Sequence, residues 1–236
     1  MVFSSYIFIL LFLPIIIFVT YSLKGSCNEL RLVFLSVASL FFYAYWDWRF
    51  LWVILLSVLV NYCFGCIIRK NYFFIKKKKL ILVLGVFFNI ILLGYFKYTN
   101  FFIDNINSIL NVSYSSLSII LPLGISFFTF QQIAYLVDTY HKKVVDHNFN
   151  HYFLFVTFFP QLIAGPIVHH RETLTQFVKG RGATISVNLF SRGITIFIIG
   201  LMKKVLIADN IAAIYSTPVF EASSVIPIPL LESWCG

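Results

Sequence analysis

The stretch LPLGISFFTFQQIAYLVDTY (residues 121–140) decides the fold, because it sets helix-breaking and polar residues within an otherwise membrane-grade apolar segment. The residues concerned are Pro122, Gly124, Gln131, Gln132 and Asp138. At membrane depth, broken backbone and polar side chains are tolerated only where they face protein or a water-filled cavity. The segment therefore predicts the lining of an interior site.

The composition of the chain indicates a polytopic membrane protein. Of its 236 residues 60% are hydrophobic and only 11% are charged, with a mean hydropathy of +0.89, whereas soluble domains carry about 25% charged residues. Several runs lack Asp, Glu, Lys and Arg and are about long enough to cross a hydrocarbon core of about 30 Å, namely residues 1–23, 50–68, 80–96 and 105–137. We expect an all-α, polytopic helical membrane protein with broken or re-entrant helices around a cavity, forming one integral membrane domain over residues 1–236.

The net charge of +9 does not indicate a nucleic-acid partner, because the cations gather in short loops between apolar runs. Cytoplasmic loops of membrane proteins carry an excess of Lys and Arg. The cluster at residues 69–79 therefore predicts a cytoplasmic loop, which places residues 47–49 and the N-terminus outside.

Other segments give local expectations. Residues 97–110 mix apolar and polar side chains in a pattern typical of an interfacial amphipathic helix, and residues 111–118 form a polar loop. The apolar run 152–168 is broken by prolines, and residues 184–208 have a helical pattern.

Polar groups inside apolar runs are the candidates for a substrate-binding, cavity-lining role: Gln131, Gln132, Asp138, Gln161 and Arg192. Helical geometry puts Gln131 and Asp138, at positions i and i+7, on one face. Hydrogen bonding between helices explains the amides equally well, and both interpretations stay open. Arg192 either snorkels to the interface or faces a protein-lined cavity.

Cysteines and histidines give weaker signals. Cys63 and Cys66 form a C-x-x-C pattern in a continuous apolar run, which favours helix packing over redox or metal chemistry. His169 and His170 precede an Arg-Glu pair, where an interfacial polar cluster is favoured over a general base. Three further histidines have near-helical spacing but share a loop with two lysines, so no metal site is predicted there: His141, His147 and His151.

Five blocks of sequence carry a family resemblance: FFYAYWDWRF (41–50), LGYFKYTNFF (93–102), LPLGISFFTFQQIAYLVDTY (121–140), FFPQLIAGPIVHHRE (158–172) and GLMKKVLIADNIA (200–212). In content, order and spacing they resemble the membrane-bound O-acyltransferases. Within that family they are most similar to the bacterial members that O-acetylate alginate. The resemblance covers nearly the whole chain.

The resemblance implies a multi-pass protein of the bacterial inner membrane. Such a protein helps to move an acyl group from a cytoplasmic donor such as acetyl-CoA to an extracytoplasmic acceptor, as in the O-acetylation of an exopolysaccharide such as alginate. The implied partners are membrane lipid and extracytoplasmic acetyltransferases or polysaccharide-modifying proteins, and no bound cofactor is implied.

The family's histidine belongs to a block resembling DFWRRWHISLS, and none of the five histidines here matches it. We therefore expect the N-terminal half of an acyltransferase, through a frameshift, a split gene or an incomplete record, and assign no catalytic residue. A polytopic transporter remains an alternative, because broken apolar segments with midplane polar groups are also typical of transporters, although no internal symmetry is evident. A non-catalytic membrane scaffold, in which Gln131, Asp138 and Arg192 only join helices, is the other alternative.

Overall fold

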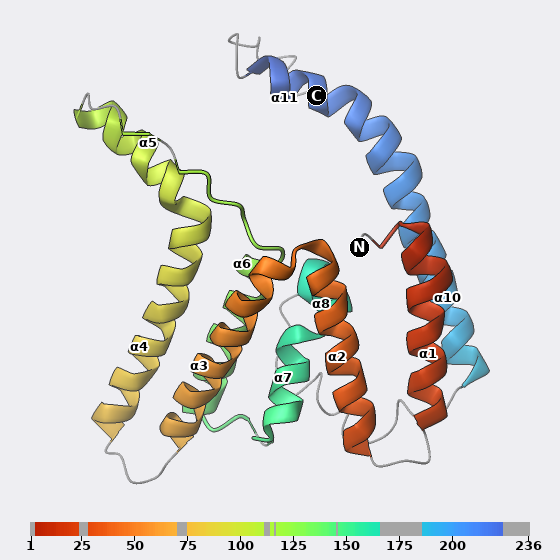
Figure 1. The fold of residues 1–236 in the computed structure, drawn as a ribbon, viewed down its shortest axis with the longest axis horizontal. Coiled ribbons are helices and arrows are strands. Elements are labelled where there is room, and N and C mark those ends of the chain that lie inside the picture. Colours follow the sequence, from red (N-terminus) through yellow and green to blue (C-terminus); the bar gives the residue numbers. More distant parts are fainter. Residues whose placement is uncertain are drawn as a thin grey trace. The chain divides into compact units, whose positions relative to one another are not determined.

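Apolar runs without internal proline form the long helices among the described residues (Figure 1). The computed structural model describes residues 3–23, 28–69, 75–110, 114–115, 117–144, 146–165 and 186–223. Within these ranges the chain is helical and has no β-strand, which confirms the all-α class. Three helical stretches there are long and apolar enough to cross a membrane, so the chain is a membrane protein: Asn28–Trp46, Trp48–Arg69 and Lys77–Leu110.

The described residues group into two compact units, one built mainly from Phe18–Ala183 and one from Val2–Ile17 with Thr184–Gly236. The expectation of a single integral membrane domain stays a prediction. The first unit holds most of the helices: α2 (Asn28–Trp46), η3 (Trp48–Phe50), α3 (Leu51–Arg69), α4 (Ile75–Leu93), η4 (Gly94–Tyr98), α5 (Thr99–Leu110), α6 (Ile125–Tyr140), α7 (Phe149–Thr157) and α8 (Phe159–Ala164).

Within the first unit, α2, α3 and α4 run alternately up and down, so that the end of α3 and the starts of α2 and α4 lie at one end (Figure 1). Helix α6 packs against α3 and α4, while α2 packs against α7 and α8. The turn between α2 and α3 is capped by Asp47, whose carboxylate accepts from the backbone N–H of Arg49 at 3.0 Å and pairs with its guanidinium. The first unit is thus a bundle centred on α6.

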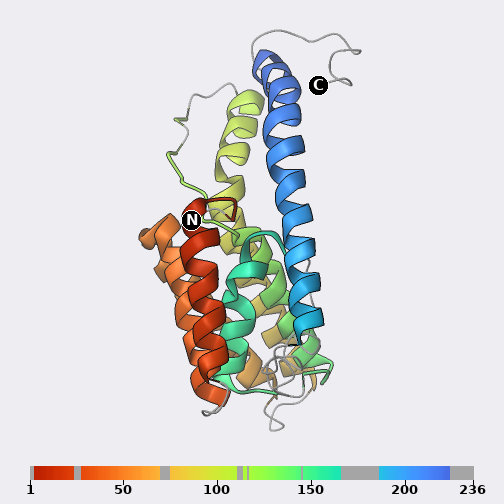
Figure 2. The same ribbon diagram turned by 90° about the vertical axis from the view of Figure 1, so that its right-hand side faces the viewer.

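The second unit contains the π-helix η1 (Phe8–Phe12) and a continuous helical stretch made of α10 (Val187–Met202), η6 (Lys203–Ala212) and α11 (Ala213–Ser223). Helix α1 (Leu13–Ser22) follows η1 directly. Figure 2 shows α10 and its continuation as one long rod. The helix predicted over residues 184–208 is confirmed for its described part and extends to Ser223.

Residues 97–110 are helical, as predicted. They do not form a separate helix, because α5 continues α4 through the π-helix η4. The combined stretch Lys77–Leu110 has 34 residues. At 1.5 Å per residue it is about 51 Å long, more than a hydrocarbon core of about 30 Å. Part of this helix must therefore extend past the core or tilt strongly.

After α5 the chain returns along the same helix in an extended form. Asn100 and Asn107, one heptad apart, each exchange two hydrogen bonds with the returning backbone, at Leu117 (2.8 and 3.0 Å) and at Tyr114 (2.8 and 2.9 Å). These side chains satisfy backbone groups that no helix or sheet satisfies. The predicted polar loop is thus partly held against α5 by hydrogen bonds.

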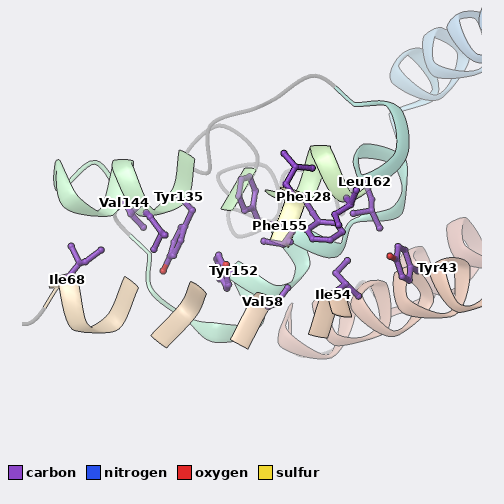
Figure 3. Close-up of a cluster of buried hydrophobic side chains, with 14 residues drawn as sticks. Tyr43, Ile54, Val58, Ile68, Phe128, Tyr135, Val144, Tyr152, Phe155 and Leu162 are labelled. Atoms are coloured by element: carbon purple, nitrogen blue, oxygen red, sulfur yellow. The ribbon is translucent and has the colours of Figure 1, made fainter. Parts of the chain in front are cut away.

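The core of the first unit lies where α3, α6 and α7 meet (Figure 3). Tyr152 is buried between Tyr62 and Tyr135. Its ring centroid lies 5.6 Å from that of Tyr62 and 4.2 Å from that of Tyr135. A Cβ atom on Gly65 would lie 2.8 Å from the Tyr135 ring, and one on Gly85 would lie 2.7 Å from Leu136. These two glycines let α3 and α4 approach α6 closely.

Candidate functional site

Helix α6 begins at Ile125 because Gly124 adopts the left-handed conformation, with φ +68°. A Cβ atom at this position would lie 2.5 Å from the backbone carbonyl oxygen of Leu162 in α8. Only glycine suits both the conformation and the space. The interruption predicted at Pro122 and Gly124 is confirmed: residues 117–122 are not helical, and α6 starts immediately after the glycine.

Gln132 is fully buried at the centre of a polar network from three helices. Its side-chain carbonyl oxygen accepts hydrogen bonds from the Ser57 hydroxyl of α3, at 2.8 Å, and from the Asn61 amide. Asn61 also exchanges hydrogen bonds with Asn89 of α4, at 3.2 and 2.6 Å. The network joins α3, α4 and α6 through side chains alone.

This network lies near the middle of the bundle. Asn61 is ten residues after the start of α3 at Leu51, which places it about 15 Å along the helix. The Gln132 side-chain nitrogen and the Thr129 hydroxyl, one helical turn apart, are buried without a hydrogen-bond partner in the described part of the chain. The interior of α6 therefore combines satisfied and unsatisfied polar groups at a depth where lipid offers no substitute.

Gln131 supports a break between α7 and α8. Helix α7 ends at Thr157 because Phe158 leaves the helical conformation, with ψ 109°, and Pro160 in the first turn of α8 lacks an N–H group. The Phe159 N–H donates to the Ser39 hydroxyl of α2 at 3.2 Å. The Phe155 carbonyl, which would otherwise bond to Phe159, accepts from the Gln131 side-chain amide at 2.8 Å. Side chains from α2 and α6 thus replace the backbone bonds lost at the break.

The structure places the other predicted site residues as follows. Asp138 is buried in the last turns of α6, seven residues after Gln131, and the two share the buried side of the helix as their spacing predicted. Gln161 is half-buried in α8. Arg192 is exposed on α10, in the second unit. Gln131 and Gln132 form hydrogen bonds to other helices, as the interpretation of these amides as links between helices predicted. The substrate-binding role of all five residues stays a prediction.

The three histidines of the described residues lie in different settings. His141 caps the end of α6, and His151 is buried in the first turn of α7 rather than in a loop. Burial and then the charge of Arg69 hold the pKa of His147 below its ordinary value. Among the described residues no group of three His, Cys, Asp or Glu side chains is arranged to hold a metal. His169, His170 and Pro166 lie outside the described residues.

Sequence reasoning missed the partners of the α6 amides: Ser39, Ser57, Asn61 and Asn89. Asn61 and Asn89 were visible as single amides in apolar runs, which is the signal that singled out Gln131 and Gln132. The serines gave no such signal, because a hydroxyl can bond within its own helix, as Ser39 does to the Leu35 carbonyl at 2.7 Å.

Comparison with known proteins shows what this chain is similar to. The chain is 37% identical to a peptidoglycan O-acetyltransferase of Helicobacter pylori, over 99% of this chain and 49% of the relative. It is 38% identical to the probable alginate O-acetylase AlgI of Pseudomonas aeruginosa, over 91% of this chain and 41% of the relative. The corresponding protein of Azotobacter vinelandii is 36% identical over 91% of this chain and 43% of its own length.

These relatives confirm the family resemblance, and the chain is a homologue of the membrane-bound O-acyltransferases. The chain spans about half the length, or somewhat less, of the curated relatives it matches. No protein-family model matches the chain. No solved structure matches it either.

Proposed function

We propose that this chain forms part of a membrane O-acetyltransferase that acts on a polysaccharide of the bacterial cell envelope or exterior. The observation that carries the proposal is the similarity, over 91–99% of the chain, to proteins named peptidoglycan O-acetyltransferase and alginate O-acetylase. The three helices with the length and apolarity of membrane spans support it. The inner membrane of a bacterium is the proposed location. The end of the first unit where α3 finishes and α4 begins, which carries Arg69 and Lys77–Lys79, is proposed to face the cytoplasm.

In the proposed reaction of the whole enzyme, an acceptor hydroxyl oxygen attacks the acetyl carbonyl carbon of a cytoplasmic thioester donor such as acetyl-CoA. The oxygen–carbon bond forms, the carbon–sulfur bond breaks, and the hydroxyl proton passes through a general base to the departing thiolate. We assign no such base among the residues that the structure describes. The proposed contribution of this chain is a rigid wall, formed by the helices that α6 joins, that excludes bulk water and so limits hydrolysis of the donor.

The wall is proposed to present Gln131, Gln132, Asp138 and Gln161 as its polar groups, and Arg192 of the second unit is proposed as a further substrate-binding group of the enzyme. Extracytoplasmic acetyltransferases or other polysaccharide-modifying proteins are the proposed partners, and membrane lipid is the surroundings. The buried hydrogen bonds of Gln131 and Gln132 favour a bracing contribution for these two residues.

The test is to delete the coding segment and to measure the acetate that mild base releases from purified peptidoglycan and, separately, from exopolysaccharide. We expect ester-linked acetate to fall in one of the two fractions and to return when the segment is restored. The fraction that changes identifies the acceptor class. Unchanged acetate in both fractions contradicts the proposed function.

A further inference from the structure

Positive side chains from three separate elements gather at the end of the first unit where α3 finishes and α4 begins. In the described part of the chain none of them forms an ion pair, unlike Arg49 and Lys204, which are paired with Asp47 and Asp209. These residues form the basic cluster: Arg69 of α3, Lys77, Lys78 and Lys79 of α4, and Lys142 and Lys143 after α6. All are exposed except Lys78, which is half-buried.

Packing contacts bring the three elements together. Helix α6 touches α3 where Gly65 lies against Tyr135, and it touches α4 where Gly85 lies against the next residue, Leu136. Arg69 follows the first contact by one helical turn, and the lysines of α4 precede the second contact by about two turns. The two lysines after α6 follow both contacts by six to eight residues. The positive charges therefore converge at one end of the bundle (Figure 1).

The loop after α6 is held against α3 at this same end. The Tyr62 hydroxyl of α3 donates to the backbone carbonyl of His147 at 3.0 Å, and the charge of Arg69 acts on the His147 ring. The two carboxylates of this region do not form ion pairs with the basic cluster. Asp138 is buried within the bundle, and Asp146 is hydrogen-bonded to the ring of the buried histidine of α7. The positive charge of the cluster is thus left for an anion from outside the chain.

An exposed apolar stripe on α4 begins directly beside the cluster. Leu80, Leu84 and Phe87 are all exposed, and their spacing of three to four residues puts them on one face of the helix. Lys77, three residues before Leu80, continues the same face to the cluster. This part of α4 lies within a stretch that is long and apolar enough to cross a membrane. A ligand that fits both features has an anionic head and apolar chains.

We propose that the basic cluster binds the headgroup of an anionic phospholipid, whose acyl chains lie along the stripe of Leu80, Leu84 and Phe87. Lysines and arginines at the boundary of a membrane attract anionic headgroups, and basic pockets between membrane helices bind them specifically. A soluble phosphate ester satisfies the charges but not the stripe, so the lipid is the better fit. The bound headgroup links the ends of α3, α4 and α6 by relieving the repulsion among their cations. The proposal does not depend on acetyl transfer.

The test equilibrates the full chain with micelles that contain equal amounts of phosphatidylglycerol and phosphatidylcholine, and counts the retained lipids by native mass spectrometry. We expect the wild-type protein to prefer phosphatidylglycerol, and Lys77→Gln and Lys142→Gln each to reduce this preference about fivefold.

Lys97→Gln is the matched control. Lys97 is exposed on the same continuous helix but outside the cluster, with its Nζ atom 5.5 Å from the centroid of the Tyr98 ring. We expect a change of less than about twofold for this variant, because a single cation lacks the combined field of the cluster.

Equal losses for Lys77→Gln and Lys97→Gln would contradict the proposal, since net charge alone would then attract the lipid. A wild-type protein without preference would contradict it too. Pyrophosphate that binds in pure phosphatidylcholine and is lost in Lys77→Gln, with no preference between the lipids, would assign the cluster to a soluble ligand instead. If the variants do not accumulate, the wild-type preference is measured against sodium chloride concentration. It should fall as salt rises, and a preference independent of salt would overturn recognition by charge.

Discussion

At the scale of single residues, the buried amides of α6 act on neighbouring helices rather than on their own. Replacing Gln132 with leucine removes the acceptor for the Ser57 hydroxyl and one acceptor for Asn61. We expect the free energy of unfolding to fall by about 1–2 kcal/mol, since hydrogen bonds between membrane helices average about 0.6 kcal/mol and orphaned buried groups cost more. Unfolding in mixed detergent micelles measures the loss.

Asn105→Leu is the matched control for Gln132→Leu. Asn105 is exposed, and its side-chain amide donates to the Phe101 carbonyl of its own helix, at 2.6 Å. We expect its replacement to leave the free energy of unfolding within about 0.5 kcal/mol of the wild-type value. Equal losses for the two variants would show that the Gln132 network does not hold α3, α4 and α6 together.

Glycine contacts give a second prediction at this scale. Gly65→Ala would set a methyl group 2.8 Å from the Tyr135 ring, whereas nothing lies within 4 Å of the corresponding position at Gly94. We expect Gly65→Ala to destabilise the protein by about 1–3 kcal/mol through overpacking, and Gly94→Ala to be neutral or slightly stabilising. Thermal unfolding of both variants separates a close helix approach from a general effect of removing glycine.

The sequence allowed prediction of which polar residues of α6 face inward, but not of their partners. Gln131 and Gln132 stand out because an amide in an apolar run needs a partner, whatever the fold. Which residue provides that partner depends on how α3, α4 and α7 are aligned along α6. The Ser57 contact spans 75 positions of sequence, and no local pattern encodes it.

At the scale of elements, the break between α7 and α8 depends on two side chains from other helices. Ser39→Ala and Gln131→Leu each remove one side-chain partner from the break, the acceptor of the Phe159 N–H and the donor to the Phe155 carbonyl respectively. We expect each variant to lose about 1–3 kcal/mol of stability. Hydrogen exchange at residues 155–162 should increase in both variants. Protection equal to that of the wild-type protein would contradict this role.

The turn between α2 and α3 provides a pH-dependent prediction. Hydrogen bonds from the side chain and the backbone of Arg49 hold the pKa of Asp47 below its ordinary value. The ion pair therefore contributes stability above that ordinary value, and the contribution is lost as the pH falls through the lowered pKa. Arg49→Gln should return the pKa of Asp47 toward its ordinary value in a carboxyl NMR titration. An unchanged pKa would exclude the Arg49 side chain as a cause and leave the backbone N–H of residue 49.

Helix breaks were predictable from the sequence, whereas helix continuity was not. Pro122, Gly124 and Pro160 change the backbone through their own covalent structure, so their effects are local. The continuation of α4 into α5 is different, because the polar residues after Lys97 resemble an interfacial pattern. Asn100 and Asn107 instead turn toward the returning chain, a contact that only the folded structure reveals.

At the scale of the whole molecule, the charges of the first unit are unevenly placed. Among the described residues, the cations at the end where α3 finishes and α4 begins include Arg69, Lys77, Lys78 and Lys79, together with Lys142 and Lys143 after α6. The turn between α2 and α3, at the opposite end, has Arg49, which is paired with Asp47. This asymmetry supports a cytoplasmic position for the cation-rich end.

If this bundle crosses a membrane with its polar side-chain network at mid-depth, η3, just before α3, and the first turns of α4, just after it, lie on opposite sides of the membrane, and cysteine labelling at these two places determines the sides. Lys79→Cys and Trp48→Cys, each in a background without native cysteines, would be treated in intact cells with a membrane-impermeant maleimide. Both side chains are exposed in the structure. We predict labelling at position 48 in intact cells and at position 79 only after permeabilisation. Labelling of both positions from the same side would show that α3 does not cross the membrane.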